Sequence, residues 1–457
     1  MVGVTDTARR WAVLAVVSAA QFLAILDLWV VNIALPALGR DFAPAGLAQV
    51  SWILNGYTIV LAALLVPAGQ LADSYGRRRA FLAGLAVFGA ASLGCALAPD
   101  LPVLVACRVV QAVGAAVVLP TSLGLALAAF PARQRGAAVG TWAAVGAVAA
   151  GSGPVLGGLL VAGSWRWIFL VGVPLALAAL VAGRAVLPRT EVVRAGRLDV
   201  RGVLLALGAT GLTCTALTEA AAWPPALVAP LLAGGLGLAG AFAVHLRRHP
   251  DPVVPPRLFA VRAFRTGVLG VAAYYLGFAT LLLGTTLLLT GPWHWSVLRA
   301  AAGIAPGPLV AGLVSPVAGR LLARTGRRGA ILVGAPLFAL AGVVPLVAGG
   351  TTYAVVVLPS MVLWGVANGF LQPALFATAG VVPPGDLAVG SAVLATARQL
   401  GSAVGVALLV AVLGARPAAF GYAWLVVVGT AVLTAATAIP VPDRAASRVR
   451  PSEGATR

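Results

Sequence analysis

The sequence predicts an all-helical protein that spans a lipid membrane many times. Hydrophobic residues make up 61% of the 457 residues and charged residues only 9%, and the mean hydropathy is +1.01. A surface that faces water needs more charged side chains than this, so lipid must surround most of the chain. The apolar stretches are close to the length of about 20 residues that a helix needs to cross a bilayer.

Charged clusters divide the chain into about fourteen such apolar stretches. The first is too long for a signal peptide and contains Asp27, so we interpret it as a membrane span. Glycine and proline occur inside several stretches, as membrane helices permit. The expected spans lie near residues 11–36, 50–70, 80–98, 102–127, 137–162, 166–187, 202–221, 225–246, 266–290, 300–323, 329–349, 353–376, 388–414 and 420–440.

The arginines predict how these spans are oriented. Lysine is absent, so all 31 basic residues are arginine. With the N-terminus inside, few of them fall outside the inner loops and the chain ends: Arg40, Arg166, Arg299 and Arg416 in outer loops, and Arg108 and Arg398 within spans. This imbalance follows the positive-inside rule and predicts that both termini are cytoplasmic.

An internal repeat divides the chain into two halves. The pattern Gly69-x-Leu-x-Asp73-x-x-Gly76-Arg77-Arg78 returns as Gly319-x-Leu-x-Ala323-x-x-Gly-Arg-Arg328, and each copy closes an even-numbered span on the inner side. Repeated halves of this kind are typical of transporters in which one bundle rocks against another.

The repeat predicts four parts of the chain. Two six-helix bundles occupy residues 1–190 and 263–442, and two inserted linker helices with their inner loops occupy 191–262. Residues 443–457 form a cytoplasmic tail. The count of fourteen transmembrane helices follows from two times six plus the two inserted ones.

Several soluble functions are excluded. A chain without lysine has no phosphate-binding loop, and Gly151-Ser-Gly153-Pro-Val-Leu156 lacks the third glycine of a dinucleotide fingerprint. Cys95, Cys107 and Cys214 lack metal-ligand spacing. The net charge of +19 lies in gaps between apolar stretches, so it indicates topology rather than nucleic-acid binding. We expect no enzyme, no catalytic residue, no metal site and no cofactor.

Asp27 is the only acidic residue near the middle of a span. An ionised side chain there costs about 3 kcal/mol on insertion scales. A carboxyl in that position can load and release a proton as access alternates between the two sides of the membrane, although a carboxylate permanently paired with Arg108 is the alternative. Glu219 lies near an outer boundary, where a solvated acid at the end of a span is the better explanation.

Arg108 and Gln111 are three residues apart, so they share one face of a helix. An arginine in mid-membrane could tune the proton on Asp27, attract an anionic substrate or anchor packing. Arg398 has a weaker claim, because it can reach the inner surface.

Two further spans carry distinctive faces. In the fifth span, small residues repeat at three- and four-residue spacing: Gly146, Ala149 or Ala150, Gly153 and Gly157. They form a smooth stripe for close helix packing, or a hinge with Pro154. In the span at 353–376, a polar and aromatic face could line a cavity; it is formed by Trp364, Asn368 and Gln372.

Four motifs together resemble the fourteen-helix drug:proton antiporter branch of the major facilitator superfamily. They are the first-helix motif Leu26-Asp27-Leu-Trp29-Val-Val-Asn32-Ile-Ala-Leu-Pro36, the loop motif Gly69 to Arg79, the fourth-helix motif Arg108-Val-Val-Gln111-Ala-Val-Gly114, and the fifth-helix antiporter motif of Gly140 with Gly153-Pro154-Val-Leu-Gly157-Gly158. Trp29, Ala112 and Ala149 depart from the usual residues of these motifs.

The resemblance implies roles for these residues. Asp27 and Arg108 would couple protons, and the substrate would contact Trp29, Asn32, Gln111, Trp364, Asn368 and Gln372. A conformational latch would comprise Gly69, Asp73, Gly76, Arg77 and Arg78. The second copy has Ala323 in place of the acid, so the latch belongs to the first half.

The function implied is export of amphipathic, often cationic drugs or metabolites, driven by the proton gradient. The expected partners are a small-molecule substrate, protons and the lipid bilayer of a bacterial inner membrane, with the protein acting as a monomer. A dedicated exporter of one natural product is an alternative, in which Arg108 and Trp29 favour an anionic or aromatic ligand. A membrane sensor that transports nothing is a third possibility, but it would call for a signalling domain.

Overall fold

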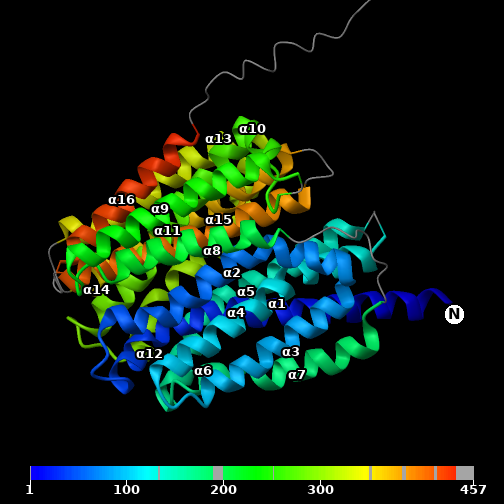
Figure 1. Cartoon of the computed structure of the whole chain (residues 1–457), viewed down its shortest axis with the longest axis horizontal. Helices are drawn as coiled ribbons and strands as arrows, with labels where there is room; N and C mark the ends of the chain where they lie inside the picture. The colour runs from blue at the N-terminus through cyan, green and yellow to red at the C-terminus, as the bar shows by residue number, and fades with distance from the viewer. Residues whose placement is uncertain are drawn as a thin grey trace, which may run out of the picture.

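The computed structural model describes residues 2–131, 134–188, 199–250, 252–348, 352–382, 387–415 and 419–438. Within these ranges the chain is helical and contains no strand, and the long helices run roughly side by side (Figure 1). The expected tail at 443–457 lies outside the described residues.

The helices follow the expected apolar stretches. The first half contains α1 (Val2–Asp41), α2 (Leu47–Tyr75), α3 (Arg77–Ala96), α4 (Leu101–Ala129), α5 (Arg135–Gly163), α6 (Trp167–Leu170) and α7 (Gly172–Val186). The inserted pair is α8 (Val200–Thr218) and α9 (Pro225–Arg248). The second half contains α10 (Arg257–Ala260), α11 (Arg262–Thr290), α12 (Val297–Ile304), α13 (Pro306–Val347), α14 (Tyr353–Phe376), η2 (Ala377–Val381), α15 (Leu387–Ala415) and α16 (Phe420–Ala436).

The all-helical, multi-span prediction is confirmed, whereas the count of fourteen spans is not. In the described part of the chain, 12 helical stretches are long and apolar enough to cross a membrane. Two further apolar stretches, Val148–Gly163 and Phe420–Ala436, are shorter.

The internal repeat places a glycine with positive φ at the corresponding turn of each half. Gly76, between α2 and α3, has φ of 94°, and Gly326, at the kink inside α13, has φ of 67°. Side chains rarely tolerate positive φ, so glycine is required at each turn. The arginine after each glycine reaches a neighbouring segment: Arg77 Nη1 donates to the Gly124 carbonyl oxygen (3.5 Å) and Arg327 Nη1 to Thr378 Oγ1 (3.3 Å).

The inserted helix α8 lies in the seam between the two halves (Figure 1). Cys214 of α8 packs in one apolar cluster with Ile59 of α2 and Ala403 of α15. The halves also bond directly, since Thr396 Oγ1 donates to the Ala62 carbonyl oxygen (3.1 Å). The helix α9 lies outside α8 and is mostly exposed.

Glu219, which ends α8, corrects one expectation. Its side chain is only 8% exposed and accepts a hydrogen bond from Trp52 Nε1 (3.4 Å). The prediction of a solvated acid is therefore wrong, because α8 packs this end against α2. The neighbouring Thr218 Oγ1 accepts a bond from Asn55 Nδ2 of α2 (3.2 Å).

Asp199 caps the other end of α8. Its side chain accepts hydrogen bonds from the backbone N–H groups of Gly202 (2.8 Å) and Val253 (3.0 Å) and from His245 Nε2 (2.8 Å). Burial raises the pKa of this carboxyl, but the hydrogen bonds and the His245 charge outweigh burial and lower the pKa below its usual value.

Candidate functional site

A buried ion pair joins α1 to α4. Arg108 Nη1 donates to Asp27 Oδ2 at 2.6 Å; the arginine side chain has no exposed surface, and Asp27 is 7% exposed. Arg108 Nε donates to the carbonyl oxygen of Ile53 on α2 (3.1 Å). The guanidinium is thus fixed by three helices, and the charge of each partner is compensated inside the bundle.

Gln111 completes this network from the same face of α4. Its Nε2 donates to Asp27 Oδ1 (3.1 Å) and to Ser92 Oγ (2.7 Å), and its Oε1 accepts from Arg108 Nη1 (2.6 Å). Both oxygens of Asp27 therefore accept a hydrogen bond. The Asp27 carboxylate is thus held on both sides by the side chains of one face of α4.

Aromatic rings enclose the guanidinium. The Cζ atom of Arg108 lies 4.0 Å from the ring centroid of Tyr57 and 5.8 Å from that of Phe169. Cation–π attraction is strongest where water is excluded, as it is here. Within the described part of the chain, Nη2 of Arg108 has no hydrogen-bond partner, so one guanidinium donor remains available.

Trp29 lies on α1 where the two halves meet. The centroid of its ring is 5.5 Å from the ring centroid of Phe278 (α11) and 6.5 Å from that of Trp364 (α14). The ring centroids of Phe278 and Trp364 are 5.4 Å apart. Trp29 follows Asp27 by two residues along α1. A molecule that separates these rings would therefore act on the helix that carries the buried acid.

The glycine stripe of α5 is a close-packing surface. A Cβ on Gly153 would overlap the Trp29 side chain, one on Gly157 would lie 3.2 Å from Val30 Cα, and one on Gly158 would lie 2.8 Å from Ala301 Cβ. The stripe thus holds α5 against α1 of its own half and α12 of the other. Pro154 is buried within the same helix.

The remaining predicted substrate residues are more dispersed. Asn368 Oδ1 accepts a hydrogen bond from Tyr274 of α11 (2.6 Å). Asn32 is buried, and its Oδ1 has no partner among the described residues. Gln372 is exposed rather than enclosed. The structure therefore brings Trp29 and Trp364 together, and it places Gln111 beside the proposed proton carrier Asp27. It does not gather the six predicted substrate residues into one pocket.

The loop motif is described only in part. Gly69 faces Pro120 of α4, Arg77 reaches Gly124, and Arg78 Nη2 donates to the Arg184 carbonyl oxygen (2.5 Å). The side chains of Asp73 and Ala323 lie outside the described residues. The arginines of the motif thus bind helices of their own half.

Sequence reasoning overlooked several uncharged members of the site. Tyr57, Ser92 and Phe278 contact Arg108, Gln111 and Trp29, respectively, as given above, and Tyr274 bonds to Asn368. Each lies inside an apolar stretch, where a single polar or aromatic residue is an available signal, although a weak one. Tyr274 and Tyr275 form the clearest one, because two adjacent tyrosines occupy the middle of a span.

Known proteins are similar in sequence to this chain over most of its length. The sequence profile of the Major Facilitator Superfamily matches residues 17–406. The puromycin resistance protein pur8 of Streptomyces alboniger is 38% identical over 413 residues, which are 88% of this chain and 81% of that protein. The multidrug resistance protein Stp of Mycobacterium tuberculosis is 32% identical over 400 residues, covering 86% and 74%.

A solved structure agrees at the level of the fold. The crystal structure of the human organic anion transporter MFSD10 (TETRAN) superposes with a TM-score of 0.67 and 18% identity, covering 94% of this chain and 99% of that one.

Proposed function

This chain belongs to the major facilitator superfamily, and we propose that it is a proton-coupled exporter of amphipathic, often cationic drugs or metabolites across the bacterial cell membrane. The names of its relatives, a puromycin resistance protein and a multidrug resistance protein, support export of such compounds. Their bacterial sources support the bacterial membrane. The observation that carries proton coupling is the buried pair of Asp27 and Arg108 beside Trp29.

The coupling follows from the energetics of the pair. In the proposed cycle Asp27 is ionised while Arg108 and Gln111 bond to its two oxygens. Protonating it would leave the Arg108 charge buried and uncompensated, which costs about 3–5 kcal/mol. A proton can therefore bind only when α1 and α4 separate the two side chains, and it leaves when they meet again.

The substrate is coupled to the same helix through Trp29. A planar amphipathic molecule entering between the halves would compete with the contacts of Trp29 with Phe278 and Trp364, and so would favour one position of α1. Exchange of one proton for one monovalent cation would be electroneutral. The membrane potential, about 2.3 kcal/mol per charge per 100 mV, would then contribute only to the export of neutral substrates.

We also propose the number of spans, the orientation of the termini and the conformational latch. Adding Val148–Gly163 and Phe420–Ala436 to the longer helices gives fourteen spans with both termini cytoplasmic. In the proposed latch, Asp73 acts with Arg77 and Arg78 to hold the two halves in one conformational state. The protein is proposed to act as a monomer. Replacing Asp73 with Asn should shift the balance of inward and outward states; a loss of substrate affinity alone would argue against the latch.

A dedicated exporter of one natural product is the second candidate. The relative named for puromycin favours it, whereas the one named for multidrug resistance favours breadth. Arg108 retains a free donor on Nη2, which suits an anionic group.

The proposal is tested with inverted membrane vesicles energised by a pH gradient. Uptake of puromycin and of a fluorescent aromatic cation should follow the gradient in the wild type and stop in Asp27→Asn. Uptake that persists without a gradient would overturn proton coupling. Uptake of one compound alone would favour the dedicated exporter.

A further inference from the structure

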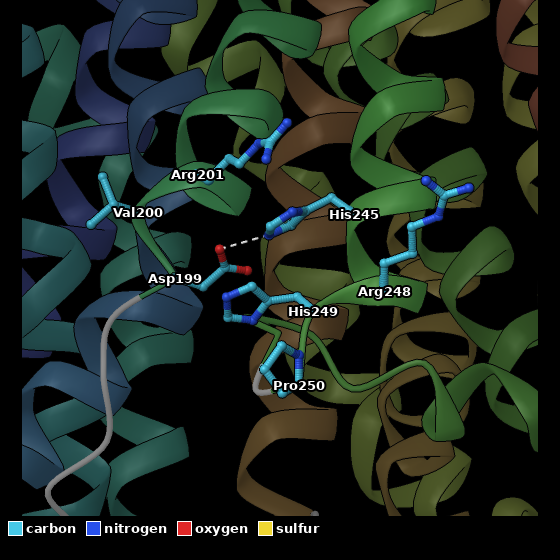
Figure 2. Close-up of a pocket in the computed structure, with 7 residues that line it drawn as sticks. All are labelled: Asp199, Val200, Arg201, His245, Arg248, His249 and Pro250. Atoms are coloured by element: carbon cyan, nitrogen blue, oxygen red, sulfur yellow. Dashed lines mark hydrogen bonds and ion pairs between the residues drawn. The ribbon is translucent and has the colours of Figure 1, made fainter.

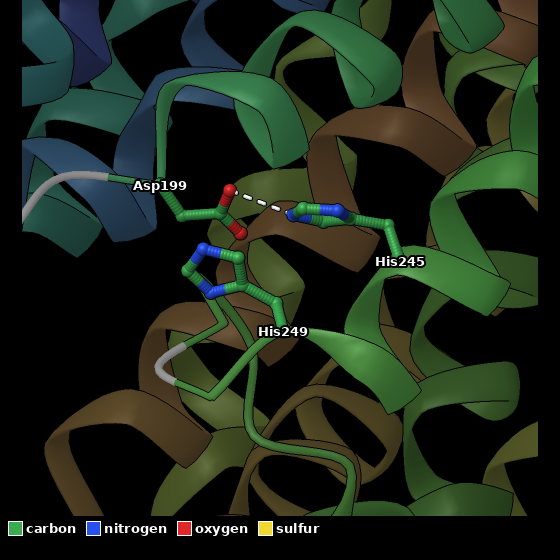
Figure 3. Close-up of side chains that lie close together, drawn as sticks. All are labelled: Asp199, His245 and His249. Carbon is green, nitrogen blue, oxygen red and sulfur yellow. Dashed lines mark hydrogen bonds and ion pairs between the residues drawn. The ribbon is translucent and has the colours of Figure 1, made fainter.

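A cluster of metal-binding side chains lies where the inserted helices begin and end. Asp199 precedes α8, His245 lies in the last turn of α9, and His249 follows that helix. One potential ligand atom from each of the three residues lies within 4.8 Å of the other two. Figure 3 shows the carboxylate and the two imidazole rings facing one another.

Both histidines come from the C-terminal end of α9. They are four residues apart, and their ring centroids lie 4.9 Å from each other. His245 Nε2 is 2.8 Å from Asp199 Oδ1. Two ligands bound to one ion at about 2.1 Å each lie roughly 3–4 Å apart, so shifts of about an ångström would close the site.

The carboxylate is held in place by bonds that leave room for an ion. The backbone N–H of Gly202 bonds to Oδ1 and that of Val253 to Oδ2. Each oxygen has two lone pairs. His245 Nε2 takes the second one of Oδ1, so Oδ2 can still accept a further partner, and Oδ1 can do so once His245 binds the ion instead. Ligand carboxylates in metal sites are typically oriented by hydrogen bonds of this kind.

We propose that Asp199, His245 and His249 bind a divalent transition-metal ion of the Zn²⁺ class, with water as a fourth ligand. Two imidazole nitrogens and one carboxylate oxygen are a common ligand set for Zn²⁺. A helix cap and an ion pair use Asp199 and His245 alone, whereas a metal site also uses the imidazole of His249 that lies beside them.

The surroundings favour a cation over an anion at this point. The three residues line a cavity of about 510 Å³ together with Arg201 and Arg248. In Figure 2 the guanidinium group of each arginine extends away from the Asp199 carboxylate. An anion placed between the histidines would face this carboxylate directly, whereas a cation would be stabilised by it.

A bound ion would fasten three separate segments. It would join the start of α8, the end of α9 and, through the Val253 N–H, the segment that leads to α10 and α11. Gln70 of α2, within the loop motif, donates to the Val253 carbonyl oxygen (3.4 Å). Metal binding would thus fix the inserted pair beside the motif of the first half.

Zinc titration of the full-length protein, purified with a tag that contains no histidine, tests the site. We expect one Zn²⁺ per chain by calorimetry and elemental analysis. His245→Ala and His249→Ala should each weaken binding at least tenfold, since even an outer hydrogen-bond partner of a metal ligand contributes about 10–100-fold. His294→Ala is the matched control, because the chain has only three histidines, and it should bind as the wild type does.

A second readout needs no variant. Zn²⁺ should protect His245 and His249, but not His294, from diethyl pyrocarbonate, as mapped by mass spectrometry. No stoichiometric binding by the wild type, equal binding by all variants, or equal modification of the three histidines with and without zinc would overturn the site.

Discussion

The two halves share a loop but differ in what joins their helices. In each half the first span is bonded to the fourth by a contact of 2.6 Å. In the first half this contact is the ion pair of Asp27 with Arg108, and in the second it is the neutral hydrogen bond of Tyr274 with Asn368. The corresponding pair of helices is therefore joined by charged side chains in one half and by uncharged side chains in the other.

The ion pair and the neutral hydrogen bond suit the two halves to different functions. Aromatic rings surround the neutral contact, with Tyr274 lying 5.0 Å from Phe338 and 6.3 Å from Phe278. The second half is thus suited to packing and to an apolar ligand surface. In the proposed mechanism the first half exchanges the proton.

The largest effect is expected from breaking the ion pair on one side. Arg108→Gln leaves the Asp27 carboxylate buried without a counter-charge, so the free energy of unfolding should fall by about 3–5 kcal/mol. Denaturant unfolding of the purified protein measures this. The double variant Asp27→Asn with Arg108→Gln buries no charge and should recover most of the loss; an equally unstable double variant would show that the charge does not matter.

The shared loop should respond alike in the two halves. Gly76→Ala and Gly326→Ala each place a side chain at positive φ, which costs about 1–3 kcal/mol. A Cβ on Gly326 meets no other atom within 4 Å, so its cost is backbone strain alone. Gly429→Ala, in α16 and equally open, is the control and should be neutral or stabilising in thermal unfolding. A loss in one half only would mean that the loops are not equivalent.

The neutral contact should matter less than the charged one. Tyr274→Phe removes the donor to Asn368, and we expect the free energy of unfolding to fall by about 1 kcal/mol. The number of protons exchanged per substrate, measured in proteoliposomes, should not change. A loss of coupling as complete as in Asp27→Asn would contradict the division between the halves.

The smallest effect concerns the ring that touches both halves. Trp29→Leu removes the ring that an aromatic cation would stack on between the halves. Such a ring contact is worth about 0.5–1.5 kcal/mol, so the cation should bind about 2–10-fold more weakly in a fluorescence titration. Trp223→Leu alters an exposed tryptophan and serves as the control. An equal loss of affinity in the two variants would show that Trp29 does not contact the substrate.

Much of the fold could be predicted because it depends on local chemistry. Hydropathy predicted where the helices lie, and the repeated motif predicted that a span ends at each of its two copies. The three-residue spacing of Arg108 and Gln111 predicted their common face. Asp27 was recognisable because a mid-span acid is costly, and its pairing with Arg108, which the structure shows, was the alternative to a proton carrier.

The remainder depends on packing between distant segments. Tyr57 and Ser92 are ordinary residues in apolar helices, and only the approach of α2 and α3 to α4 gives them partners. Glu219 is buried because α8 enters the seam beside α2, which its position at the end of a span did not indicate. Asp199 meets His245 and His249 only because α8 and α9 are antiparallel and return to the same level.

The central claim is that Asp27 releases its proton when substrate binds, because binding favours the state in which it pairs with Arg108. Proton release on addition of substrate, recorded with a pH-sensitive dye in weakly buffered proteoliposomes, measures this directly. We predict release in the wild type and none in Asp27→Asn, with substrate binding retained in the variant. Undiminished proton release in Asp27→Asn would contradict the account.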